Sequence, residues 1–330
     1  MMPFPVVAGY VIAALAVPFV LHFHLLSAVF SGMAVHVLTV RLARGLPGKW
    51  GGFAHKLALG AIVLCVAAGL FGTGLGILSF LRGSRGMAAL LTAVADTFEN
   101  LQRTLPPDLA DSIPTSLGDL REPITAMLRD HAVKISAAGM AGFKTFAHVV
   151  LGMVVGGMTA IHHFDPPDGR SPLGTSLHSR MQAIITAFEK VVFAQVKIAA
   201  LNTALTACYL LIVLPLFGIR LPMLSVLVPL TFVTGLLPVV GNVVSNTAIV
   251  LISLGTSPGT AVASTVFLVA IHKLEYFTNA RIVGGEVQAT AWELLCAMLA
   301  MEAVFGISGL IAAPVVYACL KAELKDLHLI

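Results

Sequence analysis

Charged residues are scarce in this sequence of 330 residues: 11% are Asp, Glu, Lys or Arg, whereas 58% are hydrophobic. Soluble domains carry about 25% charged residues. So little charge excludes a soluble globule of this size and predicts a protein whose surface is covered by a lipid bilayer. The net charge of +4 forms no basic block, so we expect no nucleic-acid partner.

Cysteine and the common catalytic motifs are scarce as well. The four cysteines all lie in apolar segments, so we expect neither disulfides nor a zinc site. The sequence contains no P-loop and no nucleophile elbow, which argues against an ATP-driven pump and gives no basis for an enzyme. We therefore expect no cofactor and no enzymatic activity, with a membrane-embedded enzyme as the minor alternative.

Two histidine-rich segments invite a metal hypothesis. They are His22 with His24, and His162-His163 followed by Asp165 and Asp168. Neither segment supplies a closed set of ligands at a known metal spacing. We therefore expect no metal.

Long apolar runs are what the sequence has in abundance. A transmembrane helix needs about 20 mostly apolar residues. The runs predict an all-α, polytopic membrane protein with about eight spans. These are Pro5–His22, Leu25–Leu42, Leu57–Leu81, Met140–Ile161, Ile198–Phe217, Leu221–Leu254, Gly259–Ile271 extended to about Thr278, and Ala289–Leu320.

Two of these runs are too long for one straight crossing. As a single helix, 221–254 would extend roughly 50 Å at about 1.5 Å per residue, against a hydrocarbon core of about 30 Å. Each long run must be tilted, broken or folded back as a hairpin. Helix-breaking residues mark the breaks: Pro238 and Gly241 in the first run, and Gly306, Gly309 and Pro314 in the second.

The loops predict orientation and domain organisation. Residues 41–56 hold four Lys or Arg and no acid, which places this loop and the N-terminus in the cytoplasm. The C-terminus is cytoplasmic too if each long run crosses once. We predict N-terminal spans at 1–82, an extracytoplasmic insert at 83–139, and a membrane core at 140–330 with a cytoplasmic helical segment at about 164–197.

Apolar stripes predict amphipathic helices outside the spans, at 87–105, 117–128 and 177–192. None has the strongly basic polar face expected of a lipid-binding helix. We favour packing against the core or a sister subunit over lying on the bilayer surface.

Polar residues inside the spans carry the functional signal. Asn242 and Asn246 are four residues apart, so on a helix they share one face. Both follow the predicted break, where freed backbone groups are tolerated only if they are buried in protein or line a wet cavity. Secondary transporters build substrate and ion sites at such discontinuous helices. The alternative is plain hydrogen bonding between helices by asparagine.

Charged residues give a weaker signal. Glu302 lies in the last run, where burial would suit a proton or cation carrier. The alternatives are a salt bridge to a neighbouring helix and a site at the membrane surface. His272, Lys273, Glu275 and Arg281 follow the seventh span. They are candidate gate charges, or a plain interfacial cluster.

The C-terminal half resembles the autoinducer-2 exporter family of prokaryotic membrane proteins. The resemblance is carried by Pro238-Val239-Val240-Gly241, by Lys273-Leu274-Glu275 with Arg281-Ile282-Val283-Gly284, and by the run from Phe305 to Pro314 with Gly306 and Gly309. Ala280 stands where the family often has a proline. The motifs cover about 190–325, whereas over 1–190 the span order and the helical insert agree.

The resemblance implies eight spans in the prokaryotic inner membrane, both termini in the cytoplasm, and a homo-oligomer, a pentamer in particular. It also implies export of autoinducer-2 by some members and sodium–proton antiport by others. We expect a secondary transporter that exports a small solute by alternating access at the two broken helices, with Asn242 and Asn246 contacting the solute or the ion. The alternatives are a passive channel formed by an oligomer, a sodium–proton antiporter, or a non-transporting membrane scaffold.

Overall fold

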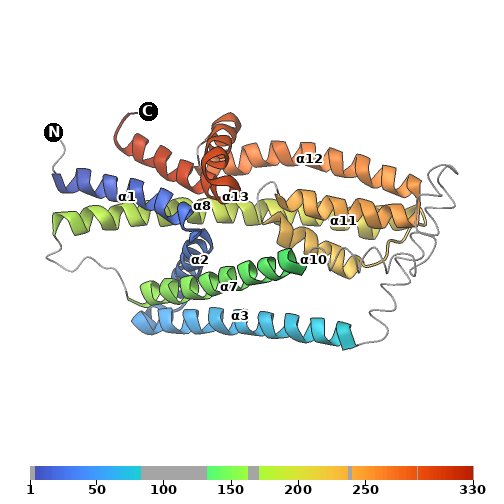
Figure 1. The fold of residues 1–330 in the computed structure, drawn as a ribbon, viewed down its shortest axis with the longest axis horizontal. Helices are drawn as coiled ribbons and strands as arrows, with labels where there is room; N and C mark the ends of the chain where they lie inside the picture. The colour runs from blue at the N-terminus through green and yellow to red at the C-terminus, as the bar shows by residue number, and fades with distance from the viewer. Residues whose placement is uncertain (1–3, 83–131, 163–170, 237–239, 288, 330) are drawn as a thin grey trace. The chain divides into compact units, whose positions relative to one another are not determined.

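The computed structural model describes residues 4–82, 132–162, 171–236, 240–287 and 289–329 (Figure 1). Within these ranges the regular secondary structure is entirely helical, so the predicted all-α class is confirmed. The chain divides into two compact units. Each unit is described by itself below.

Unit 1 comprises residues 1–71, 138–193 and 283–330. Its helices are α1 (Phe4–His22), α2 (Leu26–Arg44), the 3₁₀ turn η1 (Gly48–Trp50) and α13 (Ala291–Asp326), with parts of α3 (Gly51–Arg82), α7 (Ala132–Ile161) and α8 (Pro172–Cys208). Its core contains Val37, Ala187, Phe188, Ala289, Val315 and Ala318.

Glycines bring α2 and α7 of unit 1 into backbone contact. A Cβ atom at Gly152 would meet the carbonyl oxygen of Ala28, and one at Gly156 would meet that of Gly32. Ser31 Oγ adds a hydrogen bond of 3.0 Å to the Val149 carbonyl oxygen. Small residues give this close approach in membrane helices, where packing rather than hydrophobic burial holds helices together.

Unit 2 comprises residues 72–137 and 194–282. Its described helices are the second part of α8, the π-helical turn η2 (Tyr209–Val213), α9 (Leu214–Leu216), α10 (Leu224–Gly235), α11 (Val240–Thr256) and most of α12 (Pro258–Val287). The π turn lies just before Pro215. Because proline clashes with the carbonyl four residues earlier, a local widening of the helix relieves that contact.

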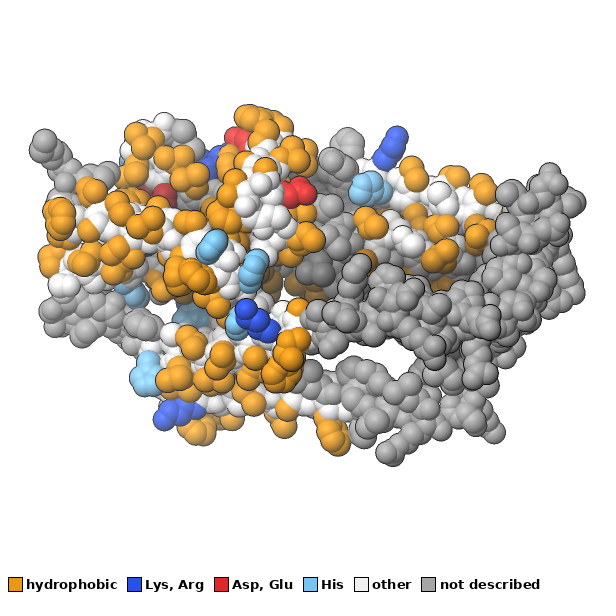
Figure 2. Space-filling view, in the orientation of Figure 1, with side chains coloured by type: hydrophobic (Ala, Val, Ile, Leu, Met, Phe, Trp, Pro, Cys, Tyr) orange, Lys and Arg blue, Asp and Glu red, His pale blue; other side chains and the backbone are white. Residues whose placement is uncertain are grey.

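Six described helical segments are long and apolar enough to cross a membrane. They are Phe4–His22, Leu26–Arg44, Gly51–Gly69, Met140–Ile161, Pro172–Leu216 and Trp292–Asp326. Large hydrophobic side chains on them are exposed, and Figure 2 shows hydrophobic side chains over much of the visible surface. The predicted polytopic membrane protein is thus confirmed.

The run 221–254 departs from a simple span. It forms α10 and α11, of 12 and 17 residues, which at about 1.5 Å per residue extend roughly 18 and 26 Å. The two helices pack against each other (Figure 1). The run therefore folds back as a hairpin, which is one of the three arrangements that its length predicted.

The segment 177–192 also differs from the prediction of a separate cytoplasmic helix. It forms the first part of α8, which continues without interruption to Cys208. Between Gly174 and Cys208 the sequence contains no proline or glycine, so nothing in the backbone ends the helix between the amphipathic stripe and the apolar run. The predicted amphipathic helices at 87–105 and 117–128 lie outside the described residues.

Candidate functional site

The candidate site lies in unit 2, where the helical structure is interrupted between α10 and α11. Gly241 is buried against the end of α10, because a Cβ atom there would meet the carbonyl oxygen of Thr234. Only glycine allows this backbone-to-backbone approach. Pro238, the other residue of the predicted break, lies outside the described residues.

Two amide side chains of α8 reach this break. Gln195 Nε2 donates a hydrogen bond of 2.8 Å to the carbonyl oxygen of Gly235, the last residue of α10. Asn202 Nδ2 donates one of 3.2 Å to Oδ1 of Asn242 at the start of α11. Carbonyl oxygens at the end of a helix have no partner within the helix, and α8 supplies one for Gly235.

Gln195 and Asn202 are functional candidates that the sequence analysis missed. They lie seven residues apart on α8, and therefore on one face of the helix. Asn202 is only 8% exposed although it lies in a candidate membrane span. Two amides at this spacing inside an apolar run are the signal that could have found them.

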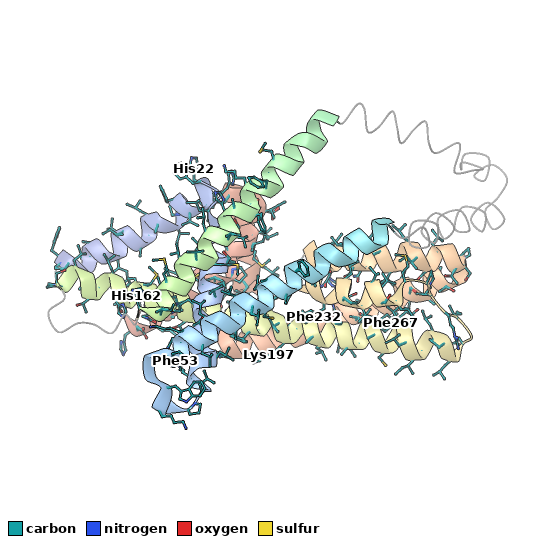
Figure 3. All side chains as sticks on the ribbon, turned by 90° about the horizontal axis from the view of Figure 1, so that it is seen from below. His22, Phe53, His162, Lys197, Phe232 and Phe267 are labelled. Carbon is teal, nitrogen blue, oxygen red and sulfur yellow. The ribbon has the colours of Figure 1, made fainter. Side chains whose placement is uncertain are left out.

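The polar face of α8 continues beyond Asn202. Thr206 and Tyr209 are buried on the same face. The Tyr209 hydroxyl lies 3.1 Å from Ser264 Oγ, which lies 2.8 Å from Ser253 Oγ. The Tyr209 ring stacks on Phe267, which is labelled in Figure 3, with centroids 3.8 Å apart. These buried hydroxyls satisfy one another, as buried polar groups must.

The site carries no negative side chain. From residue 190 to residue 274 the sequence contains no Asp or Glu. The groups around the break are amides, hydroxyls and backbone carbonyls. Such groups can hold an uncharged polar solute or a weakly held cation, but they cannot bind and release a proton as a carboxylate does.

Asn246 is the second predicted site residue on α11. Its side chain is half-buried and makes no hydrogen bond with the described residues. Asn242 is paired with Asn202, whereas Asn246 remains available one turn further along the helix.

The second predicted break is a kink in α13 of unit 1. Gly306 has φ 61° and ψ −147°, a conformation that an L side chain rarely adopts. A Cβ atom at Gly309 would meet the carbonyl oxygen of Met301. Pro314 lies inside the helix beyond the kink. Backbone groups are therefore freed within a candidate span, which runs from Trp292 to Asp326.

Glu302 lies one turn before this kink. Its side chain is exposed and makes no ion pair with any described residue. The argument from the sequence depended on burial, so the exposed position weakens it for a single copy of the chain. Glu302 belongs to unit 1 and the asparagines belong to unit 2.

Several other charges inside the spans of unit 1 are paired. Arg180 of α8 forms an ion pair with Glu323 of α13, and the Tyr10 hydroxyl of α1 donates to the same carboxylate at 3.0 Å. Lys321 pairs with Glu293 at 2.6 Å within α13. The sequence analysis missed these pairs, because no local pattern links positions so far apart in the chain.

The remaining predicted positions form no cluster within the described residues. His272 and Lys273 are exposed on α12, and the side chains of Glu275 and Arg281 lie outside the described set. His22 and His162, labelled in Figure 3, lie at the C-terminal ends of α1 and α7. His163, Asp165 and Asp168 lie outside the described residues. Within the described ranges no group of three His, Cys, Asp or Glu side chains could hold a metal ion.

An all-helical chain with several long apolar helices and a polar site at a helix break has the features of a polytopic membrane transporter. The family model described as AI-2E family transporter matches residues 5–328, and the chain belongs to that family. The predicted resemblance is confirmed, and the match extends over the N-terminal half, where only the span order and the helical insert had agreed. No curated protein and no solved structure matches the chain.

Proposed function

We propose that the chain is a secondary transporter that exports a small polar solute, of the autoinducer-2 type, in exchange for an ion. The solute or ion site is the break between α10 and α11. The observation that carries this proposal is the Asn202–Asn242 hydrogen bond beside the close contact of Gly241 with Thr234. It joins a short helical hairpin to a long helix by neutral polar groups that a solute can replace.

The chemistry of the site favours sodium over the proton as the ion bound there. Helix ends and unwound carbonyls coordinate sodium in transporters with discontinuous helices, and α10 ends at this site. A proton carrier needs a titratable group, and the nearest acids along the sequence are Glu189 and Glu275. Coupling to protons would therefore need a group outside the break, for which Glu302 remains the candidate.

The ion pairs of unit 1 support a topology with both termini on one side of the membrane. Tyr10 near the start of α1, Arg180 near the start of α8 and Glu323 near the end of α13 contact one another. The basic loop after α2 then places both termini in the cytoplasm. Location in the prokaryotic inner membrane, and a homo-oligomer with the pentamer as its form, stay predictions.

The proposal is tested by flux into proteoliposomes. A sodium gradient and a gradient of an autoinducer-2 type solute are applied separately, with a pH-sensitive dye inside. The flux of the solute should saturate as the solute concentration rises, and it should need sodium. Linear flux without saturation would instead indicate a channel, and no flux with any tested solute would favour a scaffold.

Variants locate the site. Asn242→Ala and Asn202→Ala should each lower flux about tenfold, because each removes one hydrogen bond of about 1 kcal/mol and alters the geometry of the break. The double variant should be no worse than either single variant, since both remove the same interaction. Tyr209→Phe, which removes a buried hydroxyl elsewhere in unit 2, is the matched control and should keep its flux. Equal losses in all variants would contradict the site assignment.

A further inference from the structure

A cavity of about 830 Å³ lies in unit 1. Its walls come from α2, α7 and the first part of α8, all of which belong to candidate membrane spans. Ligand pockets commonly enclose about 300–1,000 Å³, so the cavity is large enough for a small molecule. Nothing in the proposed transport mechanism uses it.

Apolar side chains and glycines make up most of the wall, and its polar residues are His36, His148, Thr159, His178 and Gln182. On α7 the wall runs from His148 through Leu151, Gly152, Val155 and Gly156 to Thr159. At about 1.5 Å per residue this stretch is roughly 16 Å long. The α7 wall is therefore an apolar strip with a polar residue at each end.

The two ends differ in what they offer a ligand. At the Thr159 end, the Thr159 hydroxyl donates to the Gly156 carbonyl oxygen at 2.8 Å, so its oxygen accepts from His36 Nδ1 at 3.1 Å. These groups satisfy each other. At the other end the His148 ring is half-buried and makes no hydrogen bond with the described residues.

The His148 end is also the positively charged end. Lys144 lies one turn before His148 and therefore on the same face of α7, and its side chain is exposed. The helical segments that line the cavity contain no Asp or Glu: α2 and α7 have none, and α8 has none before Glu189. An anionic head group at this end would meet His148 in the wall, with Lys144 one helical turn beyond it outside the wall, and no carboxylate in the wall opposes it.

We propose that this cavity binds a single-chain amphipathic carboxylic acid of the fatty-acid class. Its carboxylate lies at the Lys144–His148 end, and its chain runs along Leu151 and Val155 toward His36. An elongated apolar wall with one charged end matches a molecule that has one apolar chain and one charged head.

The test is photolabelling of the full chain in nanodiscs of zwitterionic lipid. The probe is palmitic acid that carries a photoreactive diazirine in its chain. We expect saturable labelling of residues that line the cavity, such as Met33 and Met181. Palmitate should compete, and hexadecanol, which lacks the charge, should compete about tenfold less well. Labelling confined to other parts of the chain, or equal competition by hexadecanol, would overturn the proposal.

Two pairs of variants sharpen the test. Val155→Trp fills the cavity and should lower labelling at least tenfold. Val154→Trp makes the same change at the neighbouring residue, which is about as exposed as Val155 but does not line the cavity, and should leave labelling unchanged. His148→Leu should weaken palmitate about tenfold and bring it closer to hexadecanol. His162→Leu, directly after the end of α7 and outside the cavity, should have no effect.

Further outcomes distinguish the proposal from its alternatives. If Val154→Trp and Val155→Trp lower labelling equally, the cavity is not the site. If vesicles of phosphatidylglycerol compete and palmitate does not, the occupant is a membrane phospholipid and the free acid is excluded. Far-ultraviolet circular dichroism and gel filtration of each variant separate loss of binding from loss of folding. His148→Leu, a smaller change than Val155→Trp, keeps the test decisive if the tryptophan variant fails to fold.

Discussion

The two units handle polar groups inside the membrane in opposite ways. In unit 1, charges on different helices neutralise one another: Arg180 with Glu323 and Arg41 with Glu189. In unit 2, from residue 194 to residue 274, amides and hydroxyls on different helices pair with one another, and no acidic residue is present. The same kind of lipid-embedded helix is therefore fastened by strong, specific charge pairs in one unit and by weak, neutral hydrogen bonds in the other.

The difference has a physical consequence for a transporter. A buried charge that loses its partner is costly, so the paired helices of unit 1 resist separation. A neutral hydrogen bond contributes only about 1 kcal/mol net, and a solute or a sodium ion can replace it. Unit 2 is therefore suited to replace contacts between its helices by contacts with a substrate, whereas unit 1 is suited to keep its helices paired.

Breaking the buried pair of unit 1 should have the largest effect. The Arg180 and Glu323 side chains are 19% and 14% exposed. Arg180→Leu leaves the Glu323 carboxylate partly buried without its cation, and should lower the free energy of unfolding by about 3–5 kcal/mol. Thermal unfolding in nanodiscs measures the loss.

Two further variants check that this effect comes from an uncompensated charge. The double variant Arg180→Leu with Glu323→Leu should recover much of the stability, because neither charge is left alone. Arg41→Leu breaks a pair whose arginine is 53% exposed and should cost no more than about 1 kcal/mol. Equal losses for Arg41→Leu and Arg180→Leu would contradict the role of burial.

A methyl group at the helix break should have an intermediate effect. Gly241→Ala places a Cβ atom against the Thr234 carbonyl oxygen, so the α10–α11 hairpin must open or shift, at a cost of about 1–3 kcal/mol. Because Asn242 adjoins Gly241, the flux should fall further than the loss of stability alone would explain. Gly259→Ala is the control, since its Cβ would meet only Ser257 Oγ at 3.9 Å. Unchanged flux in Gly241→Ala would show that the close contact is not required for transport.

The sequence predicts the helices well because apolar runs and helix breakers act locally. Leu25–Leu42 and Met140–Ile161 correspond closely to α2 and to the membrane part of α7. The helix at 177–192 was predicted, but its continuation into the next span was not. The amphipathic stripe and the apolar run differ in composition, so they were interpreted as two elements. No helix breaker separates them, and the backbone continues as one helix.

The contacts between helices were beyond prediction from one sequence. Asn242 stood out because it follows a glycine in an apolar run, but its partner Asn202 lies 40 residues away. Arg180 and Glu323 are separated by 143 residues. Only the packing of the helices brings such residues together, and no local pattern records that packing.

Substitution of Glu302 should have the smallest effect on stability. It tests whether a residue of unit 1 takes part in ion coupling. Its side chain is exposed and makes no ion pair with the described residues, so Glu302→Gln should shift the unfolding temperature by less than about 2 °C. Flux is the informative measurement. If protons are coupled through Glu302, the glutamine variant should retain solute binding and lose proton movement, because glutamine cannot carry a proton. If proton movement persists, Glu302 is not the coupling residue, and the neutral break in unit 2 must operate with sodium alone.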